Sequence, residues 1–334
     1  MPMNFNQPLQ IGARKIRNRA LLAPMSGVTD VPFRNLAWRF GAGAVVSEMV
    51  ASEALVCGQT EMEMKAGKCG SEIHIVQLAG REEKWIRLAA KLAVENGADI
   101  IDINMGCPAK RVTTGYSGSA LMRDLDLATR LIESVLDEVN VPVTLKMRLG
   151  WDEHSINAPE LAVRAEGLGV SMITVHGRTR CQFYKGKANW NAIKEVREQI
   201  TVPLIVNGDI ACSDTANRAA TSCDADGVMV GRAAYGAPWL PGQISGTIPA
   251  DVHPNDPAFI SDTAIEHYEM MLSFYGKEIG IKQARKHLAW YFELIASPEN
   301  SDLRNSILTS WDPAAVTSAF QIAAGRAQEM VAAA

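Results

Sequence analysis

Residues 83–103 read EKWIRLAAKLAVENGADIIDI, and this stretch holds a helical pattern followed directly by a strand pattern. Its first part, residues 83–96, has the apolar spacing of an amphipathic helix. Gly97 stands where the C-terminus of that helix is expected. Residues 100–103 form a short apolar run of the kind found in strands that are buried in a parallel sheet. We therefore predict a helix, a glycine turn and a buried strand.

The same alternation extends along the chain in both directions. Further helical patterns occupy residues 125–139, 158–167 and 190–199. Short apolar runs bounded by Gly, Pro or polar residues predict eight strands, at 20–23, 44–47, 73–78, 100–103, 143–147, 172–175, 204–206 and 227–230. Eight strands alternating with helices over roughly 230 residues predict an α/β fold, the (β/α)8 or TIM barrel.

A doubly wound sheet is the alternative arrangement of such elements. Its dinucleotide-binding fingerprint is absent, because the nearest string, Gly41-Ala-Gly43-Ala-Val-Val46, lacks the third glycine. That string also precedes a strand instead of following one. The barrel is therefore the predicted fold.

The chain changes character after Trp239. Residues 241–258 hold four prolines, which reads as a linker, and helical patterns follow. Asp312-Pro313 has the N-cap and first-turn proline of a last helix. We expect a catalytic barrel over 1–240, a linker over 241–258 and a small C-terminal helical domain over 259–334.

Composition excludes several classes of protein. The chain has 334 residues, of which 47% are hydrophobic and 21% charged, so a disordered or collagen-like state is excluded. A formal net charge of −4 argues against a polybasic binder of the histone kind. Six dispersed cysteines without a CxxC pair predict neither a metal site nor disulfides, and fit a reducing cytosol. With neither a membrane-spanning run nor an apolar signal core, we expect a soluble, cytoplasmic protein.

Polar residues gather where the predicted strands end, which is where a barrel carries its active site. Asn207-Gly208-Asp209 and Gly231-Arg232 follow the last two strands, whose loops form the usual phosphate site of such barrels. Small residues there allow close backbone approach, and a guanidinium adds charge. A phosphorylated cofactor or substrate is predicted; a tight barrel turn with a surface arginine is the alternative.

Lys146 and Arg148 alternate along the end of one strand, so they face the same side. A buried lysine needs a partner: the anionic N1–C2=O edge of a flavin, or an ion pair with Asp102 or Glu48. His176 is a base, a phosphate ligand or a packed imidazole. Gln77 reads the edge of a flavin or satisfies backbone groups.

Cys107 lies between Gly106 and Pro108 at the predicted mouth. A thiol with an ordinary pKa near 8.5 is mostly protonated at neutral pH, so it can donate a proton. Most cysteines are only small buried hydrophobes, but this one has the location of a catalytic group.

The strand ends together resemble the tRNA-dihydrouridine synthases, and are most similar to the bacterial B-type subfamily, also labelled nitrogen-regulation-like. The matching segments span the whole barrel: APMSGVTDVPFR (23–34), GAGAVVSEM (41–49), QLAG (77–80), DINMGCPAKRV (102–112), TLKMRLGWD (144–152), TVHGRTRCQFYKGKANW (174–190), VNGDI (206–210) and GVMVGRAAYGAPWL (227–240). The tail is less distinctive, although the family also ends in a helical domain.

The resemblance implies a barrel that carries FMN and reduces D-loop uridines of tRNA with NADPH. Cys107 matches the proton donor, while Asn104 and Arg178 match positions near the target base. The flavin would be held by Pro24, Met25, Ser26, Gln77, Lys146, His176, Asn207, Gly208, Asp209, Gly231 and Arg232. Ser26 replaces the Ala or Glu of many relatives, which is harmless if only its backbone is used.

The mechanism implied by the resemblance is of the ping-pong type. NADPH reduces FMN and leaves, and a uridine that has left its stack takes its place. Hydride passes from flavin N5 to C6 of the uridine, and Cys107 protonates C5 from the other face.

Binding of tRNA needs basic contacts, yet residues 238–334 hold six Lys or Arg against eleven Asp or Glu. The basic residues of the tail must therefore be clustered to serve, and the best cluster is Lys282, Arg285 and Lys286. Its alternative interpretation is an ordinary solvated helix face. We expect a monomer with tRNA and NADPH as partners, and neither a membrane nor a metal.

Two other functions remain open from the sequence. A flavin barrel acting on a free small pyrimidine shares the cofactor chemistry, although a small substrate needs neither a helical tail nor basic loops. A non-catalytic tRNA-binding protein would keep the flavin only as structure, and the presence of both Cys107 and Lys146 argues against it.

Overall fold

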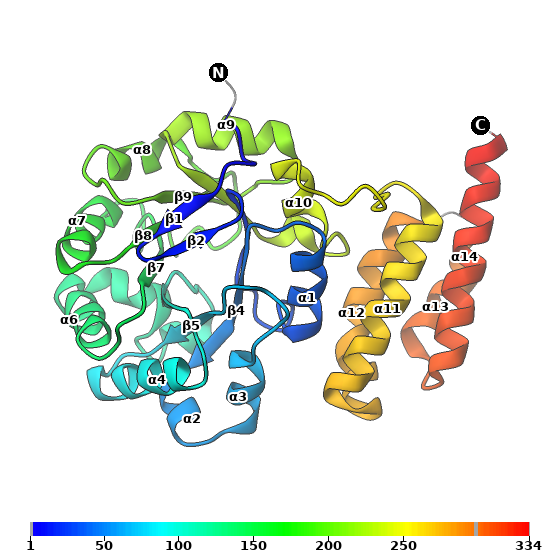
Figure 1. Ribbon diagram of the computed structural model, residues 1–334, viewed down its shortest axis with the longest axis horizontal. Helices are drawn as coiled ribbons and strands as arrows, with labels where there is room; N and C mark the ends of the chain where they lie inside the picture. The colour runs from blue at the N-terminus through cyan, green and yellow to red at the C-terminus, as the bar shows by residue number, and fades with distance from the viewer. Residues whose placement is uncertain (1–2, 297–299, 334) are drawn as a thin grey trace. The chain divides into compact units, whose positions relative to one another are not determined.

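The computed structural model describes residues 3–296 and 300–333, and its core is a closed eight-stranded parallel barrel (Figure 1). The order around the barrel is β10-β3-β4-β5-β6-β7-β8-β9, so neighbours in sequence are neighbours in space. The predicted TIM barrel is confirmed. Its strands are β3 (Ala20–Leu22), β4 (Ala44–Ala51), β5 (Ile75–Ala79), β6 (Ile100–Met105), β7 (Val143–Arg148), β8 (Met172–His176), β9 (Leu204–Asn207) and β10 (Gly227–Val230).

Helices connect successive strands, and the predicted helical patterns all form. The Asp30 side chain accepts a hydrogen bond from the Phe33 amide at 3.0 Å and so begins α1 as an N-cap. The helices of this part are α1 (Val31–Arg39), α2 (Ser52–Val56), α3 (Thr60–Ala66), α4 (Glu83–Glu95), α5 (Lys110–Thr113), α6 (Leu125–Leu136), α7 (Ala158–Leu168), α8 (Asn191–Arg197), α9 (Ser213–Cys223) and α10 (Leu240–Ser245), with 3-10 turns η1 (Gly118–Arg123) and η2 (Arg232–Ala234).

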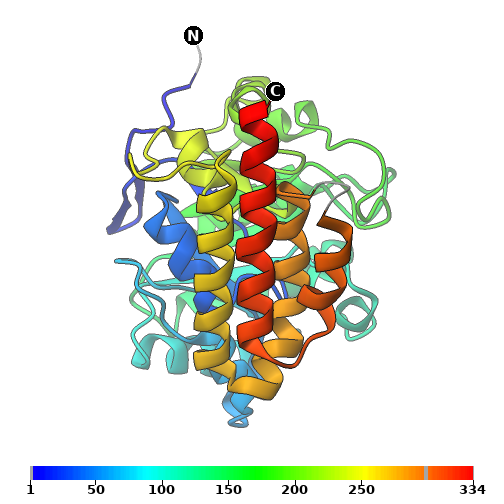
Figure 2. The same ribbon diagram turned by 90° about the vertical axis from the view of Figure 1, so that its right-hand side faces the viewer.

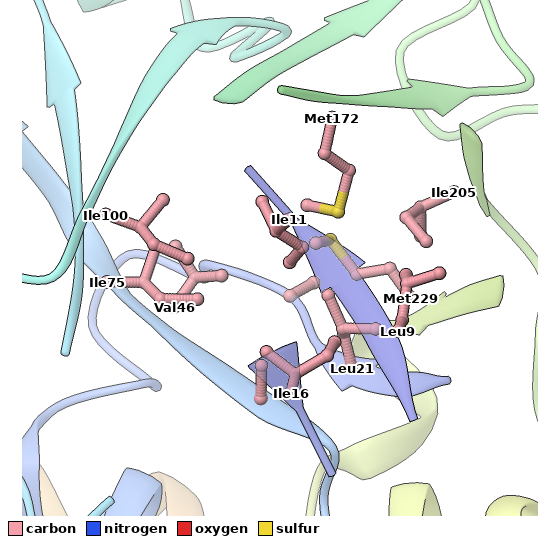
Figure 3. Close-up of a cluster of buried hydrophobic side chains, with 12 residues drawn as sticks. Leu9, Ile11, Ile16, Leu21, Val46, Ile75, Ile100, Met172, Ile205 and Met229 are labelled. Atoms are coloured by element: carbon pink, nitrogen blue, oxygen red, sulfur yellow. The ribbon is translucent and has the colours of Figure 1, made fainter. Parts of the chain in front are cut away.

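A short hairpin closes the N-terminal end of the barrel, and the sequence patterns did not predict it. Its antiparallel strands β1 (Leu9–Ile11) and β2 (Arg14–Ile16) bring Leu9, Ile11 and Ile16 into a cluster of buried apolar side chains (Figure 3). The cluster also contains Ile75 and Ile100, the first residues of their strands, which places it at the barrel floor. Each fully buried aliphatic side chain there contributes about 1.5–3 kcal/mol.

In the described part of the tail, three long helices and one short helix follow: α11 (Pro257–Tyr275), α12 (Lys277–Leu294), the shorter α13 (Ser301–Thr309) and α14 (Pro313–Ala333). Figure 2 shows them side by side, with α11 and α13 each packing against both α12 and α14. Gly276, between the first two, adopts a positive φ of 76°, which allows the reversal from α11 to α12.

The chain divides into two compact units, and both are discontinuous in sequence. One unit holds Met1–Ala233 and Leu240–Thr247, and the other holds Ala234–Trp239 and Ile248–Ala334. Within the second unit, the Tyr235 ring stacks on Trp290 with centroids 4.1 Å apart.

This division differs from the expected boundary at 240 and the expected linker over 241–258. Pro241 lies in the first turn of α10 and Pro257 begins α11, so two of the four prolines stand where a helix tolerates them. Among the described helices, none is long and apolar enough to cross a membrane.

Candidate active site

The C-terminal ends of the barrel strands carry a concentration of buried polar side chains, as the sequence predicted. Gln77, Asp102, Asn104, Lys146, His176 and Asn207 are all at most 9% exposed. They come from β5, β6, β7, β8 and β9, so strand geometry alone brings them to one mouth. Burying so many polar groups is favourable only if their hydrogen bonds are satisfied.

A chain of hydrogen bonds connects the strands β5, β6 and β7 at this mouth. The Asp102 carboxylate accepts from Gln77 Nε2 at 2.7 Å and from Thr144 Oγ1 at 2.6 Å. Gln77 Oε1 in turn accepts from Asn104 Nδ2 at 2.7 Å. Because an ionised carboxylate can only accept, Asp102 fixes which end of the Gln77 amide faces Asn104. Burial raises the pKa of Asp102 to about 6, opposed by the bonds from Thr144 and Gln77.

The same chain reaches the backbone of Cys107. Asn104 Oδ1 accepts from the Cys107 amide at 3.0 Å, and the Cys107 carbonyl accepts from Ser119 Oγ at 2.9 Å. Gly118 adopts a φ of 61°, and a Cβ there would lie 2.9 Å from the Cys107 carbonyl oxygen, so only glycine fits. The backbone of Cys107 is thus held on both sides, while its side chain remains partly exposed.

Lys146 is buried beside a neutral partner. Its Nζ donates to Asn207 Oδ1 at 3.3 Å, and Asn207 Nδ2 donates to the Met229 carbonyl at 2.7 Å. Neither Asp102 nor Glu48 forms an ion pair with it within the described part of the chain. Burial lowers the pKa of Lys146 to about 8, the Arg148 charge adds to this, and Asp102 and Cys107 partly offset it. A buried ammonium in this state favours the arrival of an anionic group.

Arg148 holds the loops around the mouth together. Its guanidinium donates to the carbonyls of Gly106 at 2.8 Å, Thr179 at 2.9 Å and Phe183 at 2.8 Å. Burial lowers its pKa to about 10, which leaves it charged at neutral pH. Through the Gly106 carbonyl, Arg148 therefore adds a further hydrogen bond that positions the Cys107 loop.

Tyr184 is a member of the site that sequence reasoning missed. The Arg232 guanidinium carbon lies 4.4 Å from the centroid of its ring, and that of Arg148 lies 5.4 Å away. The ring is 40% exposed, so it lies partly at the surface. Tyr184 belongs to an irregular segment after β8, where no periodic pattern distinguishes one residue from another. The only feature of the sequence that could have indicated its role is an aromatic residue among basic ones.

The two glycines of the predicted phosphate loops differ in their surroundings. Gly208 has a φ of 113°, and an added Cβ would lie 2.9 Å from the Ala188 Cβ and 3.0 Å from the His176 ring, so conformation and packing both require glycine there. Asp209 has a positive φ of 55°, which is uncommon outside glycine. Gly231 has only the Ala23 Cβ, at 4.0 Å, near the position of an added Cβ, so its backbone is accessible. Arg232 is exposed beside these loops.

His176 is buried, and its pKa lies well below the ordinary value. Burial is the main cause, and the charges of Arg148, Lys146, Arg178 and Arg232 act in the same direction. The imidazole is therefore neutral at physiological pH and acts through hydrogen bonding, not charge. Its Nε2 lies 3.4 Å from Arg178 Nη1.

Arg178 is 2% exposed and is directed into the protein. It donates to Asp209 Oδ2 at 2.7 Å, to the Gly186 carbonyl at 2.7 Å and to the Lys185 carbonyl at 3.2 Å. These contacts join the phosphate loop to the segment after β8. Its expected position near a target base stays a prediction.

Pro24, Met25 and Ser26 follow β3 directly, in a loop that is held from two sides. The Met25 amide donates to Thr29 Oγ1 at 2.8 Å, and the adjacent Gly27 amide donates to the Glu48 carboxylate at 2.5 Å. The side chain of Ser26 is exposed, which agrees with use of its backbone only.

The predicted basic cluster of the tail, Lys282, Arg285 and Lys286, lies in the second unit, on α12. Lys282 is exposed, whereas Arg285 and Lys286 are half-buried. Lys282 and Arg285 lie over the ring of Trp311, a residue that the sequence analysis did not single out.

The mouth has the chemistry of an anion-binding site. Four cationic side chains lie close together at it: Lys146, Arg148, Arg178 and Arg232. The carboxylates of Asp102 and Asp209 balance their positive charge only in part. The buried Lys146 ammonium, with an amide as its partner, fits the anionic ring edge of a flavin. The accessible backbone at Gly231 and the exposed Arg232 guanidinium fit its phosphate. Within the described residues no cluster of three or more potential metal ligands occurs.

Comparison with known proteins adds independent information. The family model described as Dihydrouridine synthase (Dus) matches residues 21–333. A probable tRNA-dihydrouridine synthase of Rhizobium leguminosarum bv. phaseoli is 56% identical over 298 residues, which cover 89% of this chain and 92% of the relative. tRNA-dihydrouridine synthase B of Xanthomonas axonopodis pv. citri is 42% identical over 299 residues, 89% of this chain and 90% of that protein.

Solved structures show the same fold at low identity. The old yellow enzyme homologue of Zymomonas mobilis superposes with a TM-score of 0.53 at 16% identity, covering 74% of this chain and 94% of that one. A 2-naphthoyl-CoA reductase gives a TM-score of 0.59 at 14% identity over 76% of this chain and 53% of that one.

Proposed function

The chain belongs to the dihydrouridine synthase family, so it is an oxidoreductase that reduces uridine in tRNA, and we propose that it does so with FMN at the barrel mouth and NADPH as reductant. Membership of the family implies a flavin. The observation that carries the more specific proposal is the buried Lys146 ammonium, whose hydrogen-bond partner is a neutral amide.

The residues proposed to hold FMN fall into two groups. Lys146 would hold the anionic edge of the ring system, with Gln77 and His176 as neutral hydrogen-bonding groups beside it. The backbone of Gly208 and the accessible backbone of Gly231, with the Arg232 guanidinium, would hold the phosphate. The remaining members are Pro24, Met25, Ser26, Asn207 and Asp209. When bound, the flavin supplies the hydride that C6 of the uridine receives.

Cys107 is proposed to supply the proton that C5 receives. Its thiol is partly exposed at the mouth, and its backbone is held by Asn104 and Ser119, so the group that moves the proton needs little reorganisation. Asn104 Oδ1 accepts from the amides of Gly106 and Cys107, and its Nδ2 donates to Gln77, so this residue would orient the base with its second Nδ2–H. Arg178 Nη2 is engaged by Asp209 and Gly186, so Arg178 would contact the base through Nη1, which lies 3.4 Å from His176 Nε2.

Binding of tRNA is proposed to use Lys282, Arg285 and Lys286 on α12. The support is their position on one helix in a tail that is otherwise acidic. Replacing Lys282 and Arg285 together by glutamate should weaken tRNA binding without changing NADPH oxidation. Equal tRNA affinity of this variant and the wild type would remove the cluster from the proposal.

The decisive experiment is mass analysis of tRNA from cells that lack this gene, after incubation with the purified protein and NADPH. A gain of two hydrogens at a D-loop uridine supports the proposal and identifies the position. No gain, with flavin bound and NADPH consumed, would contradict tRNA as the substrate. Anaerobic reduction of the bound flavin by NADPH and by NADH, compared at equal concentration, tests the choice of reductant.

We further propose that the enzyme works as a monomer in the cytoplasm. All six cysteines are free, which fits a reducing compartment.

A further inference from the structure

Trp311 is an exposed aromatic residue with an unusual setting. It lies between α13 and α14, and 51% of it is exposed. A large apolar ring at a surface is not by itself a site, because single exposed hydrophobic residues are common. Whether the exposed ring can bind a ligand therefore depends on the residues around it.

The backbone that carries Trp311 is held firmly. The Asp312 amide donates to Ser310 Oγ at 3.0 Å, and the Asp312 carboxylate accepts from the Ala314 amide at 3.1 Å as the cap of α14. On the other side, Arg285 Nη2 donates to the Thr309 carbonyl at 3.2 Å. The ring is thus presented from a fixed turn, so a ligand that packs on it pays little ordering entropy.

Two cations from α12 lie over the same ring. The guanidinium carbon of Arg285 is 5.1 Å from the ring centroid, and Lys282 Nζ is 5.6 Å from it. Asp312 is the adjacent acid, and its carboxylate is occupied by the cap. Since half of the ring remains exposed, the aromatic surface left free and the cations held over the ring match the two parts of an unpaired nucleotide, a base that stacks and a phosphate that needs neutralisation.

We propose that Trp311 is a stacking site for an unpaired base of the tRNA, with Lys282 and Arg285 neutralising the neighbouring phosphates. The inference rests on the proposed function, since it takes tRNA as the ligand. It separates two contributions to binding: stacking on Trp311, which depends little on salt, and phosphate contacts from the cations, which salt weakens.

The test compares tRNA affinity of Trp311→Ala, Trp311→Phe and Lys282→Gln holoenzymes across a salt series. Trp311→Ala should raise Kd by roughly 5- to 150-fold, the range expected for loss of one stacked base, and should leave the slope of log Kd against log salt unchanged. Trp311→Phe should recover most of the affinity, because it keeps an aromatic face. Lys282→Gln should reduce the slope by about one.

Ile322→Ala serves as the matched control, because Ile322 is also exposed, at 45%, and lies on α14 of the same unit. It should leave both Kd and the slope at their wild-type values. Melting temperatures of all variants, measured with the same flavin content, show whether a loss of affinity reflects unfolding.

Three results would overturn the stacking site. The first is wild-type affinity in Trp311→Ala, and the second is a Phe variant as weak as the Ala variant. The third is a reduced salt slope in Trp311→Ala, which would make the ring a support for the cations. If wild-type protein binds tRNA but adds no hydrogens to it, the proposed function fails while the stacking site stands.

Discussion

The two ends of the barrel bury side chains of opposite character, apolar at the floor and polar or ionisable at the mouth. At the floor, the β1–β2 hairpin inserts Leu9, Ile11 and Ile16 among apolar residues from the starts of the strands (Figure 3). At the mouth, the ends of the same strands bury Lys146 and Asp102, whose shifted pKa values show that the protein disfavours their charged forms. Burial of apolar side chains at the floor stabilises the fold, whereas burial of ionisable side chains at the mouth costs free energy and keeps them in place for catalysis. Substitutions at the two ends should therefore have separable effects.

The largest difference between the effect on activity and the effect on stability is expected for Cys107→Ala. Loss of the proton donor should lower kcat on tRNA by about 10²- to 10⁴-fold, because general acid catalysis is worth that much. The melting temperature should change little, since the side chain is partly exposed. Single-turnover reduction of tRNA with pre-reduced enzyme measures the step. Full turnover in this variant would show that another group protonates C5.

The opposite behaviour is expected for Ile11→Ala at the floor. The side chain is fully buried, so its truncation should lower the free energy of unfolding by about 2–5 kcal/mol. Urea unfolding measures the change, and Gln10→Ala, on the exposed face of the same strand, is the control. At a temperature where the variant is folded, turnover per folded molecule should equal that of the wild type. A comparable loss of kcat would mean that the two ends are coupled.

Lys146→Met should stabilise the flavin-free protein, in contrast to a floor substitution. The pKa of Lys146 is about 8 in the folded protein against an unfolded value near 10.5. Between these values the unfolded chain binds more protons, so wild-type stability rises with pH there. Below pH 8 the buried charge costs free energy that the variant avoids, by roughly 1–3 kcal/mol, and this advantage should fade towards pH 10.5.

The same variant should bind FMN at least about tenfold more weakly, because a charged hydrogen bond is lost. Urea unfolding at pH 7, 8.5 and 10 and a flavin titration give the two readouts. A variant that is less stable at pH 7 and binds FMN normally would contradict the role given to Lys146.

The smallest effect is expected for Ser26→Ala, which is at the mouth but exposes its side chain. Both FMN affinity and the free energy of unfolding should stay close to the wild-type values, within about 0.5 kcal/mol for stability. A large loss of FMN affinity would show that the hydroxyl, and not only the backbone, contacts the cofactor.

The fold was predictable wherever local pattern and burial coincide. Even the shortest barrel strand, the three-residue β3, is apolar throughout and fully buried, so its pattern is visible in the sequence. The three-residue strands β1 and β2 of the hairpin mix apolar with exposed polar residues and carry no such pattern. Their burial is a tertiary effect. Pro241 misled for a similar reason, since a proline marks either a linker or the first turn of a helix, and packing decides which.

The sequence predicted where the site lies, but it did not predict the hydrogen bonds that connect the residues of the site. Residues such as Cys107 and Asn104 follow strand ends, so the barrel brings them to its mouth. The hydrogen bonds of Arg178 to Asp209 and to two loop carbonyls depend on an irregular segment after β8, for which the sequence has no periodic signal. Tyr184 and Trp311 lie in such segments as well.

The interleaved course of the chain has a consequence for domain exchange. Residues Ala234–Trp239 belong to the helical unit, yet the chain returns to the barrel unit for Leu240–Thr247 before the remaining helices begin. A chimera with a single junction between Trp239 and Ile248 would therefore separate Tyr235 from its stacking partner Trp290. A single junction before Ala234 keeps that pair together but carries Leu240–Thr247 of the barrel unit along with the helices. Transfer of the helical unit alone needs three junctions, and recombination between relatives that crosses once between Trp239 and Ile248 should yield poorly folded proteins.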